Sequence, residues 1–168
     1  RANRLNPIHE GPTGIQALDL LARKIWQKDS RGLTLLMQHI ERTLKQVSHP
    51  ELAKLANIFR EHLNTAQQTT TLLGQHLQRG NVDLSLANAS LYLDLMGKVV
   101  VAWLWLEMGN HAERCFAHSQ QPQDQNFWQG KLQAARYFIT WELPQIEQHA
   151  KILQRLDRTC LDMQANWF

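Results

Sequence analysis

Apolar residues recur every three to four positions along most of the chain, with polar residues between them. One apolar stripe covers 13–25, a second covers 33–47, and polar residues at 29–32 separate the two. Such spacing is typical of amphipathic α-helices, whose apolar side chains fall on one face. The pattern predicts one helix from Thr13 to the break at 29–32, and a second helix that ends near Val47.

A third helix is predicted between two end signals. At its start, Ser48 can cap the free N–H groups, Pro50 needs no N–H in the first turn, and Glu51 can reach back as a capping box. The apolar stripe then covers 52–77. Gly80 follows it and suits the left-handed conformation that ends many helices.

The fourth predicted helix opens near Asp83, runs to about His118 and is the most apolar, so we expect it at the centre of the fold. Gly97 in its middle predicts close approach by a neighbouring element. A polar loop over 119–126 follows. The last helix is expected to begin near Phe127, with Pro144 kinking or splitting it.

No stretch alternates with period two for long enough to form a strand. The chain is therefore predicted to be all-α, an up-and-down helical bundle of about five long helices with the last one kinked near Pro144. A composition shift near Ser30 divides it. Residues 1–30 contain a loop and one helix, whereas 31–168 contain four long helices that could form a bundle by themselves.

Composition narrows the function classes only slightly. The 168 residues carry 18 Lys and Arg against 15 Asp and Glu, a formal charge of +3 with no basic run, so we expect no nucleic-acid partner. The longest uninterrupted apolar run, 99–106, is far shorter than the ~20 residues that span a bilayer. No signal peptide is visible. The sequence starts within a predicted loop and without Met, so we expect it to be a piece of a longer protein.

The two cysteines, Cys115 and Cys160, form neither a disulfide framework nor a metal motif. A reducing compartment fits them, and we expect a cytoplasmic location. A single bridge between the two stays open at this point.

Metal and pocket chemistry receive little support from the sequence. No Glu has a His three positions later, as di-iron bundles require. Glu107, His111 and Cys115 share one helix face, but a solvated helix end explains them better, so no metal is predicted. The bundle's Trp and Tyr residues are interpreted as core in preference to pocket lining; they are Tyr92, Trp103, Trp105, Trp128, Tyr137 and Trp141.

Glu10 is the strongest candidate for chemistry. It lies in an irregular loop that Pro7 and Pro12 stiffen, and Gly11 leaves the backbone free to approach a ligand. The helix that follows offers unpaired N–H groups in its first turn. Taken alone, a loop glutamate is more often a solvated surface charge.

The segment 8–16, Ile-His-Glu-Gly-Pro-Thr-Gly-Ile-Gln, resembles the Ile-Tyr-Glu-Gly-Thr-x-x-Ile-Gln signature of acyl-CoA dehydrogenases, which precedes the last helix of their C-terminal α-domain. The segments 88–93 and 127–137 resemble the helical C-terminal extension of the subgroup that includes 3-methylmercaptopropionyl-CoA dehydrogenases. The resemblance thus covers nearly the whole chain. It implies that 1–30 is the catalytic loop with the last helix of that α-domain, and 31–168 the extension.

The resemblance also implies an activity: α,β-dehydrogenation of an acyl-CoA to a 2-enoyl-CoA, with FAD as cofactor and an electron-transfer flavoprotein reoxidising it. The family's catalytic base aligns with Glu10, and the substrate contact with Gly11. The FAD contacts align with Pro12, Thr13 and Gly14, although Pro12 stands where the family usually has Thr. We expect a homo-oligomer.

The family's N-terminal α-domain and β-domain, which supply most FAD and CoA contacts, are absent from these 168 residues. We therefore expect the chain by itself to bind no flavin and to be inactive. The sequence does not choose among a subunit interface, a cover over a substrate tunnel and a membrane-surface contact for the extension. The alternative hypothesis is a non-catalytic helical bundle for subunit or protein–protein contacts.

Overall fold

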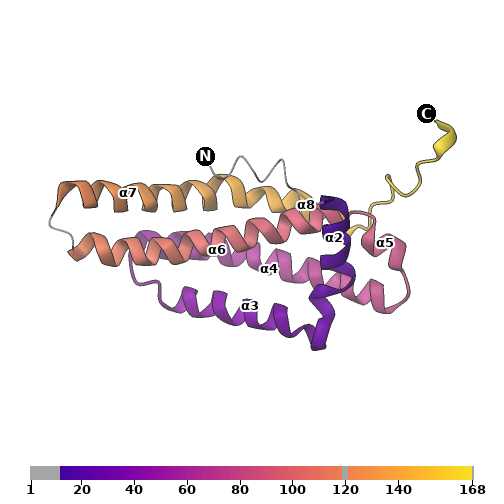
Figure 1. Cartoon of the computed structure of the whole chain (residues 1–168), viewed down its shortest axis with the longest axis horizontal. Helices are drawn as coiled ribbons and strands as arrows, with labels where there is room; N and C mark the ends of the chain where they lie inside the picture. The colour runs from indigo at the N-terminus through magenta and orange to yellow at the C-terminus, as the bar shows by residue number, and fades with distance from the viewer. Residues whose placement is uncertain (1–11, 119–120, 168) are drawn as a thin grey trace.

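The computed structural model describes residues 12–118 and 121–167, and throughout these ranges the regular elements are helical (Figure 1). The elements are α2 (Thr13–Ala22), η2 (Lys24–Trp26), α3 (Gln27–Lys45), α4 (Pro50–Gln78), α5 (Val82–Leu86), α6 (Ala89–His118), α7 (Pro122–Tyr137), η3 (Phe138–Glu142), η4 (Leu143–Gln145), α8 (Ile146–Gln154) and η5 (Ala165–Trp167). The prediction of an all-α helical bundle is confirmed.

Helix α6 lies at the centre of the bundle. It packs against α2, α3, α4, α7 and α8, and successive long helices run in alternating directions (Figure 1). Helix α2 instead runs across the bundle, near the end where α5 lies. Its Ala17 and Leu21 are fully buried and belong to the same core as Phe59 of α4 and Tyr92 of α6. Residues from α2 to α8 therefore share one hydrophobic core.

The break between the first two predicted helices is present, but the first helix ends earlier than expected. Helix α2 stops at Ala22, and the 3₁₀ turn η2 follows it. Lys28, Asp29 and Ser30 then have positive φ angles of 49°, 55° and 59°. Left-handed backbone is unfavourable for residues with a Cβ, so this segment interrupts the helix and lets α3 leave in a new direction.

The start of α4 corrects one predicted detail, and its end confirms another. His49, and not Ser48, is the N-cap: its Nδ1 accepts a hydrogen bond from the N–H of Glu51 at 3.3 Å. Gly80 has φ +83°, and its N–H donates to the carbonyl of Leu77 at 3.0 Å. This is the left-handed C-terminal motif that the sequence predicted.

The central helix differs from its predicted form in two ways. A turn at residues 87–88 separates the short α5 from α6, where one continuous helix was expected. A Cβ placed on Gly97 would meet nothing within 4 Å, so the predicted close approach there is wrong. The close approaches occur at Gly109, beside Leu52, and at Gly74, beside the ring of Trp26.

The last predicted helix begins earlier than expected and is interrupted where expected. Pro122 occupies the first turn of α7, so part of the predicted polar loop is helical. Ahead of Pro144 the backbone widens into the π-helical turn η3 and then tightens into η4. Proline lacks the N–H that an α-helix needs at this point, which accounts for the interruption.

Helix α6 as a whole is long and apolar enough to cross a membrane, although its longest uninterrupted apolar run is short. The core helix of a bundle meets the same criterion of length and composition. Ten of its residues, from Ala89 to Ala112, are buried by the surrounding helices.

Candidate functional site

Two regions of the chain are candidates for a functional site: the start of α2 and a cavity between α3 and α4. The predicted residues Glu10 and Gly11 lie outside the residues that the structure describes, so their roles stay predictions. Pro12, Thr13 and Gly14 are described and are exposed at the N-terminus of α2.

The first turn of α2 has backbone donors that find no acceptor inside the helix. The carbonyl of Pro12 accepts hydrogen bonds from the N–H groups of Ile15 at 2.9 Å and Gln16 at 3.1 Å. The N–H groups of Thr13 and Gly14 precede these and have no acceptor within the helix. The Pro12 side chain cannot cap them, and a Cβ on Gly14 would meet open space. A helix end with these features suits a polar or anionic group of a ligand.

Side chains on opposite faces of α2 have different surroundings. Ala17 and Leu21 anchor the helix in the core, whereas Ile15 is 64% exposed and Leu18 is 44% exposed. On the solvent side, Arg23 donates two hydrogen bonds to Asp19, at 2.6 and 2.9 Å, and this contact lowers the pKa of the Asp19 carboxyl. Ile15 and Leu18 therefore form an exposed apolar surface beside the first turn of α2.

A cavity of about 820 Å³ lies between α3 and α4, and Met96 and Val99 of α6 also line it. Its apolar lining includes Leu33, Met37, Leu63, Met96 and Val99. Gln38, Glu41, Arg42, Lys45 and Gln67 supply polar groups at its edge. Sequence reasoning did not find this site, because the stripe that lines it has the same spacing as an ordinary buried helix face.

Both ends of α3 are held in place beside this cavity. At one end, the Trp26 indole N–H donates to the carbonyl of Leu21 at 2.6 Å, and the ring lies against Gly74 of α4. At the other end, the indole N–H of Trp103 on α6 donates to the Thr43 hydroxyl at 2.8 Å. The amide of Asn110, also on α6, donates to the Thr43 carbonyl at 3.3 Å.

The aromatic residues divide between core and surface. Tyr92 is fully buried, and its hydroxyl lies 3.0 Å from that of Thr70, so its assignment to the core is confirmed. Tyr137 and Trp141 were also expected in the core, but they are 53% and 71% exposed, so that prediction is wrong for this pair. Their rings stack on each other at a centroid distance of 6.4 Å. The widened turn η3 carries Trp141 outward, and periodicity could not anticipate that turn.

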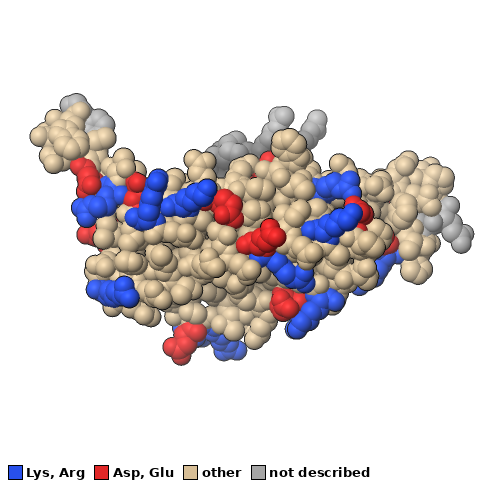
Figure 2. Space-filling model, turned by 180° about the vertical axis from the view of Figure 1, so that it is seen from behind, with Lys and Arg blue, Asp and Glu red and all other residues tan. Residues whose placement is uncertain are grey.

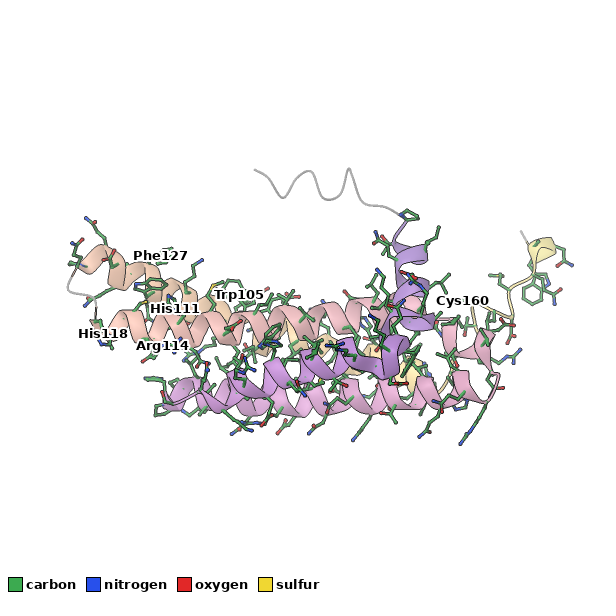
Figure 3. The ribbon with its side chains drawn as sticks, turned by 60° about the horizontal axis from the view of Figure 1, so that its bottom comes forward. Trp105, His111, Arg114, His118, Phe127 and Cys160 are labelled. Atoms are coloured by element: carbon green, nitrogen blue, oxygen red, sulfur yellow. The ribbon has the colours of Figure 1, made fainter. Side chains whose placement is uncertain are left out.

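The Glu107, His111 and Cys115 stripe has an explanation without a metal. The Cys115 thiol lies 3.4 Å from Nε2 of His111, and the His111 ring contacts Trp128 edge-on. Within the described residues no group of three His, Cys, Asp or Glu side chains is placed to hold a metal ion. Both cysteines are free, and Figure 3 shows Cys160 at the opposite end of the molecule from His111. The bridge left open by the sequence is therefore not formed.

Charged side chains of both signs are mixed on the surface. Figure 2 shows Lys and Arg interspersed with Asp and Glu on one face of the molecule. A hydrogen bond between Nδ1 of His62 and the Glu147 carboxylate, at 2.8 Å, joins α4 to α8. Lys98 of α6 lies 3.9 Å from Glu142 of η3. Because charges of both signs are mixed, the face shown in Figure 2 has no extended basic patch.

Comparison with known protein families gives one match. The family model described as "Acetyl-CoA dehydrogenase C-terminal like" matches residues 36–164, most of the chain. A search of curated proteins finds no match. The matched residues begin after the segment that contains Glu10, so they bear on the predicted extension and not on the catalytic loop.

Proposed function

Because the chain belongs to the acetyl-CoA dehydrogenase C-terminal-like family, we propose that it is the C-terminal part of a flavin-dependent acyl-CoA dehydrogenase. The observation that carries the proposal is the position of the family match. It covers 36–164 and so follows, after an interval at 17–35, the segment 8–16, which resembles the catalytic loop of the same class of enzyme. Two independent stretches of the chain thus support one assignment.

The proposed reaction converts an acyl-CoA to a 2-enoyl-CoA. The Glu10 carboxylate takes the proton from the α-carbon, which the neighbouring thioester makes acidic. A hydride leaves the β-carbon as the α,β double bond forms, and FAD, when bound, would supply the acceptor for that hydride. Gly11 would contact the substrate, and Pro12, Thr13 and Gly14 would contact the cofactor. Reoxidation by an electron-transfer flavoprotein completes the proposed cycle.

The start of α2 fits this role. The N–H groups of Thr13 and Gly14 have no acceptor in the helix, and Gly14 leaves room for a close approach. Pro12 contributes no N–H or hydroxyl where the family usually has Thr, so Thr13 is the side chain available to donate to the cofactor. Burial of Ala17 and Leu21 fixes this helix end relative to the bundle.

In this proposal the family match supports the boundary near residue 30, with the extension following it. Most FAD and CoA contacts would come from parts of the enzyme outside these 168 residues, so we expect the chain by itself to be inactive and free of flavin. We further propose a cytoplasmic, homo-oligomeric enzyme.

The test is Glu10→Gln in the intact enzyme. Loss of a catalytic base should lower the rate of acyl-CoA dehydrogenation on the order of 10²-fold or more, with flavin content unchanged. Glu61→Gln serves as a matched control, because Glu61 is exposed on α4 far along the chain. Equal rates for the two variants would contradict the assignment of Glu10.

A second candidate function, subunit or protein–protein contact without catalysis, is favoured by one observation. Val101, Leu104 and Met108 are exposed on one face of α6, the most apolar helix. Exposed apolar residues that recur along one helix face are typical of interaction surfaces. A normal dehydrogenation rate for Glu10→Gln, combined with loss of assembly on Leu104→Glu, would favour this function over catalysis.

A further inference from the structure

We propose that the cavity between α3 and α4 is a binding site for an anionic amphiphile. The apolar chain of the ligand would lie along α3, and its anionic group would meet Arg42. The site is distinct from the start of α2, and the proposal does not rest on the dehydrogenase assignment.

The size and lining of the cavity suit a small apolar chain. Its volume of about 820 Å³ falls within the range of ligand pockets, roughly 300–1,000 Å³. Its lining residues on α3 extend from Leu33 to Lys45, roughly 18 Å at 1.5 Å per helical residue, so the space is elongated. Met37 and Met96 lie in the wall, and methionine side chains adapt to irregular apolar ligands.

Hydrogen bonds hold α3 in place beside the cavity. Thr43 joins α3 to α6 through Trp103 and Asn110. Leu63 and Ala66, which are buried residues of α4, line the opposite wall. Because hydrogen bonds hold the arrangement, the space does not depend on loose packing alone.

Charge at the cavity edge selects an anion. Arg42 and Lys45 are two cations against one acid, Glu41, which lies 3.9 Å from Lys45. Among the described residues Arg42 has no ion-pair partner, so its guanidinium is available to a carboxylate or a similar group. Glu41 pairs with Lys45, and Arg42 therefore determines the expected sign of the ligand charge.

A polypeptide is a poorer occupant than a single flexible chain. The Nε2 of Gln67 on α4 lies 3.3 Å from the Sδ of Met37 on α3, so side chains of the two helices meet across the cavity. A helix about 10 Å across would have to displace that contact, whereas an unbranched alkyl chain is much thinner. The structure therefore points to a small molecule.

Calorimetric titration of the 168-residue chain with laurate tests the proposal, with dodecanol and dodecyltrimethylammonium as probes of the same chain length. We expect saturable binding of laurate at one site, weaker binding of dodecanol and the weakest binding of the cation. Arg42→Gln should weaken the binding of laurate about tenfold, because charged hydrogen bonds contribute on this scale. The affinity for dodecanol should stay unchanged. The matched control is Arg31→Gln, which changes an exposed arginine of α3 outside the cavity lining.

A pair of tryptophan variants tests the location of the apolar chain. Thr34→Trp introduces a ring at an exposed position of α3 that lines the cavity, and it should weaken the binding of both laurate and dodecanol. Leu35 is the next residue and does not line the cavity, so Leu35→Trp should leave both affinities unchanged. Equal effects of the Arg42 and Arg31 variants, equal affinity for the cationic probe, or no saturable binding of laurate would each overturn the proposal.

Discussion

Tyr92 places a large apolar ring and a hydroxyl inside the core. Because the hydroxyl is buried, we expect the stability of the fold to fall at high pH. Its side chain is fully buried, and burial raises its pKa from 10.0 to about 12. Below pH 10 the hydroxyl is neutral in both folded and unfolded chains. Between pH 10 and 12 the unfolded chain ionises first, so this contribution to stability is progressively lost, by about 2–3 kcal/mol in all.

The measurement is the free energy of unfolding in urea at pH 8, 10 and 11.5 for the wild-type chain and Tyr92→Phe. We expect the wild type to lose more stability across this range than the variant does. The Thr70 hydroxyl also donates to the Ala66 carbonyl at 2.8 Å, so Tyr92→Phe leaves that group with a partner. If the unfolding free energies of the two proteins changed equally with pH, the expectation would be contradicted.

The glycines within helices show that the sequence does not predict which of them allow close contact with a neighbouring helix. Gly97 was predicted to allow a close approach, yet it faces open space, whereas Gly74 and Gly109 meet Trp26 and Leu52. All three lie within helices and have similar apolar neighbours in the chain. The residue that each glycine contacts depends on where two helices cross. The sequence of one helix alone does not predict where that crossing lies.

At the scale of elements, the start of α4 depends on a histidine cap. Nδ1 of His49 accepts from the Glu51 N–H, and its Nε2 lies 3.0 Å from Glu113 of α6. His49→Ala should lower the free energy of unfolding by about 0.5–2 kcal/mol, since an N-cap contact is lost. Thermal or urea unfolding at neutral pH measures this change.

Ser48→Ala is the matched control, because the sequence favours Ser48 as the cap and the structure assigns that contact to its neighbour His49. We expect a change within about 0.5 kcal/mol, as for surface positions without special contacts. A larger loss for Ser48→Ala than for His49→Ala would show that the sequence-based assignment of the cap was right.

Helix positions followed from the sequence far better than helix ends did. The stripes over 33–47 and 52–77 predict α3 and α4 because one face of each helix must be buried. The Gly80 end was also predictable, since the left-handed conformation favours glycine. The turn between α5 and α6 has no Gly or Pro, and its one local signal is Asn88, a residue type that favours turns and helix N-termini.

At the scale of the whole molecule, the two candidate sites differ in how far sequence could predict them. The segment 8–16 is a local motif, so it could be identified without a structure, although Glu10 lies outside the described residues. The cavity joins Arg42 of α3 to Leu63 of α4 and Val99 of α6. Such a site exists only after three helices are placed, and no motif marks it.

The shared core makes a further prediction about the boundary near residue 30. Ala17 and Leu21 of α2 are fully buried within the bundle, so a chain that starts at Arg31 would expose the apolar surface that they cover. We expect that shorter chain to lose at least about 3 kcal/mol of unfolding free energy in urea relative to all 168 residues. In the full chain, Leu21→Ala should cost about 2–5 kcal/mol. Leu18→Ala, on the exposed side of the same helix, should change little. Equal stability of the shorter chain would instead mean that α2 contributes nothing to the fold of the extension.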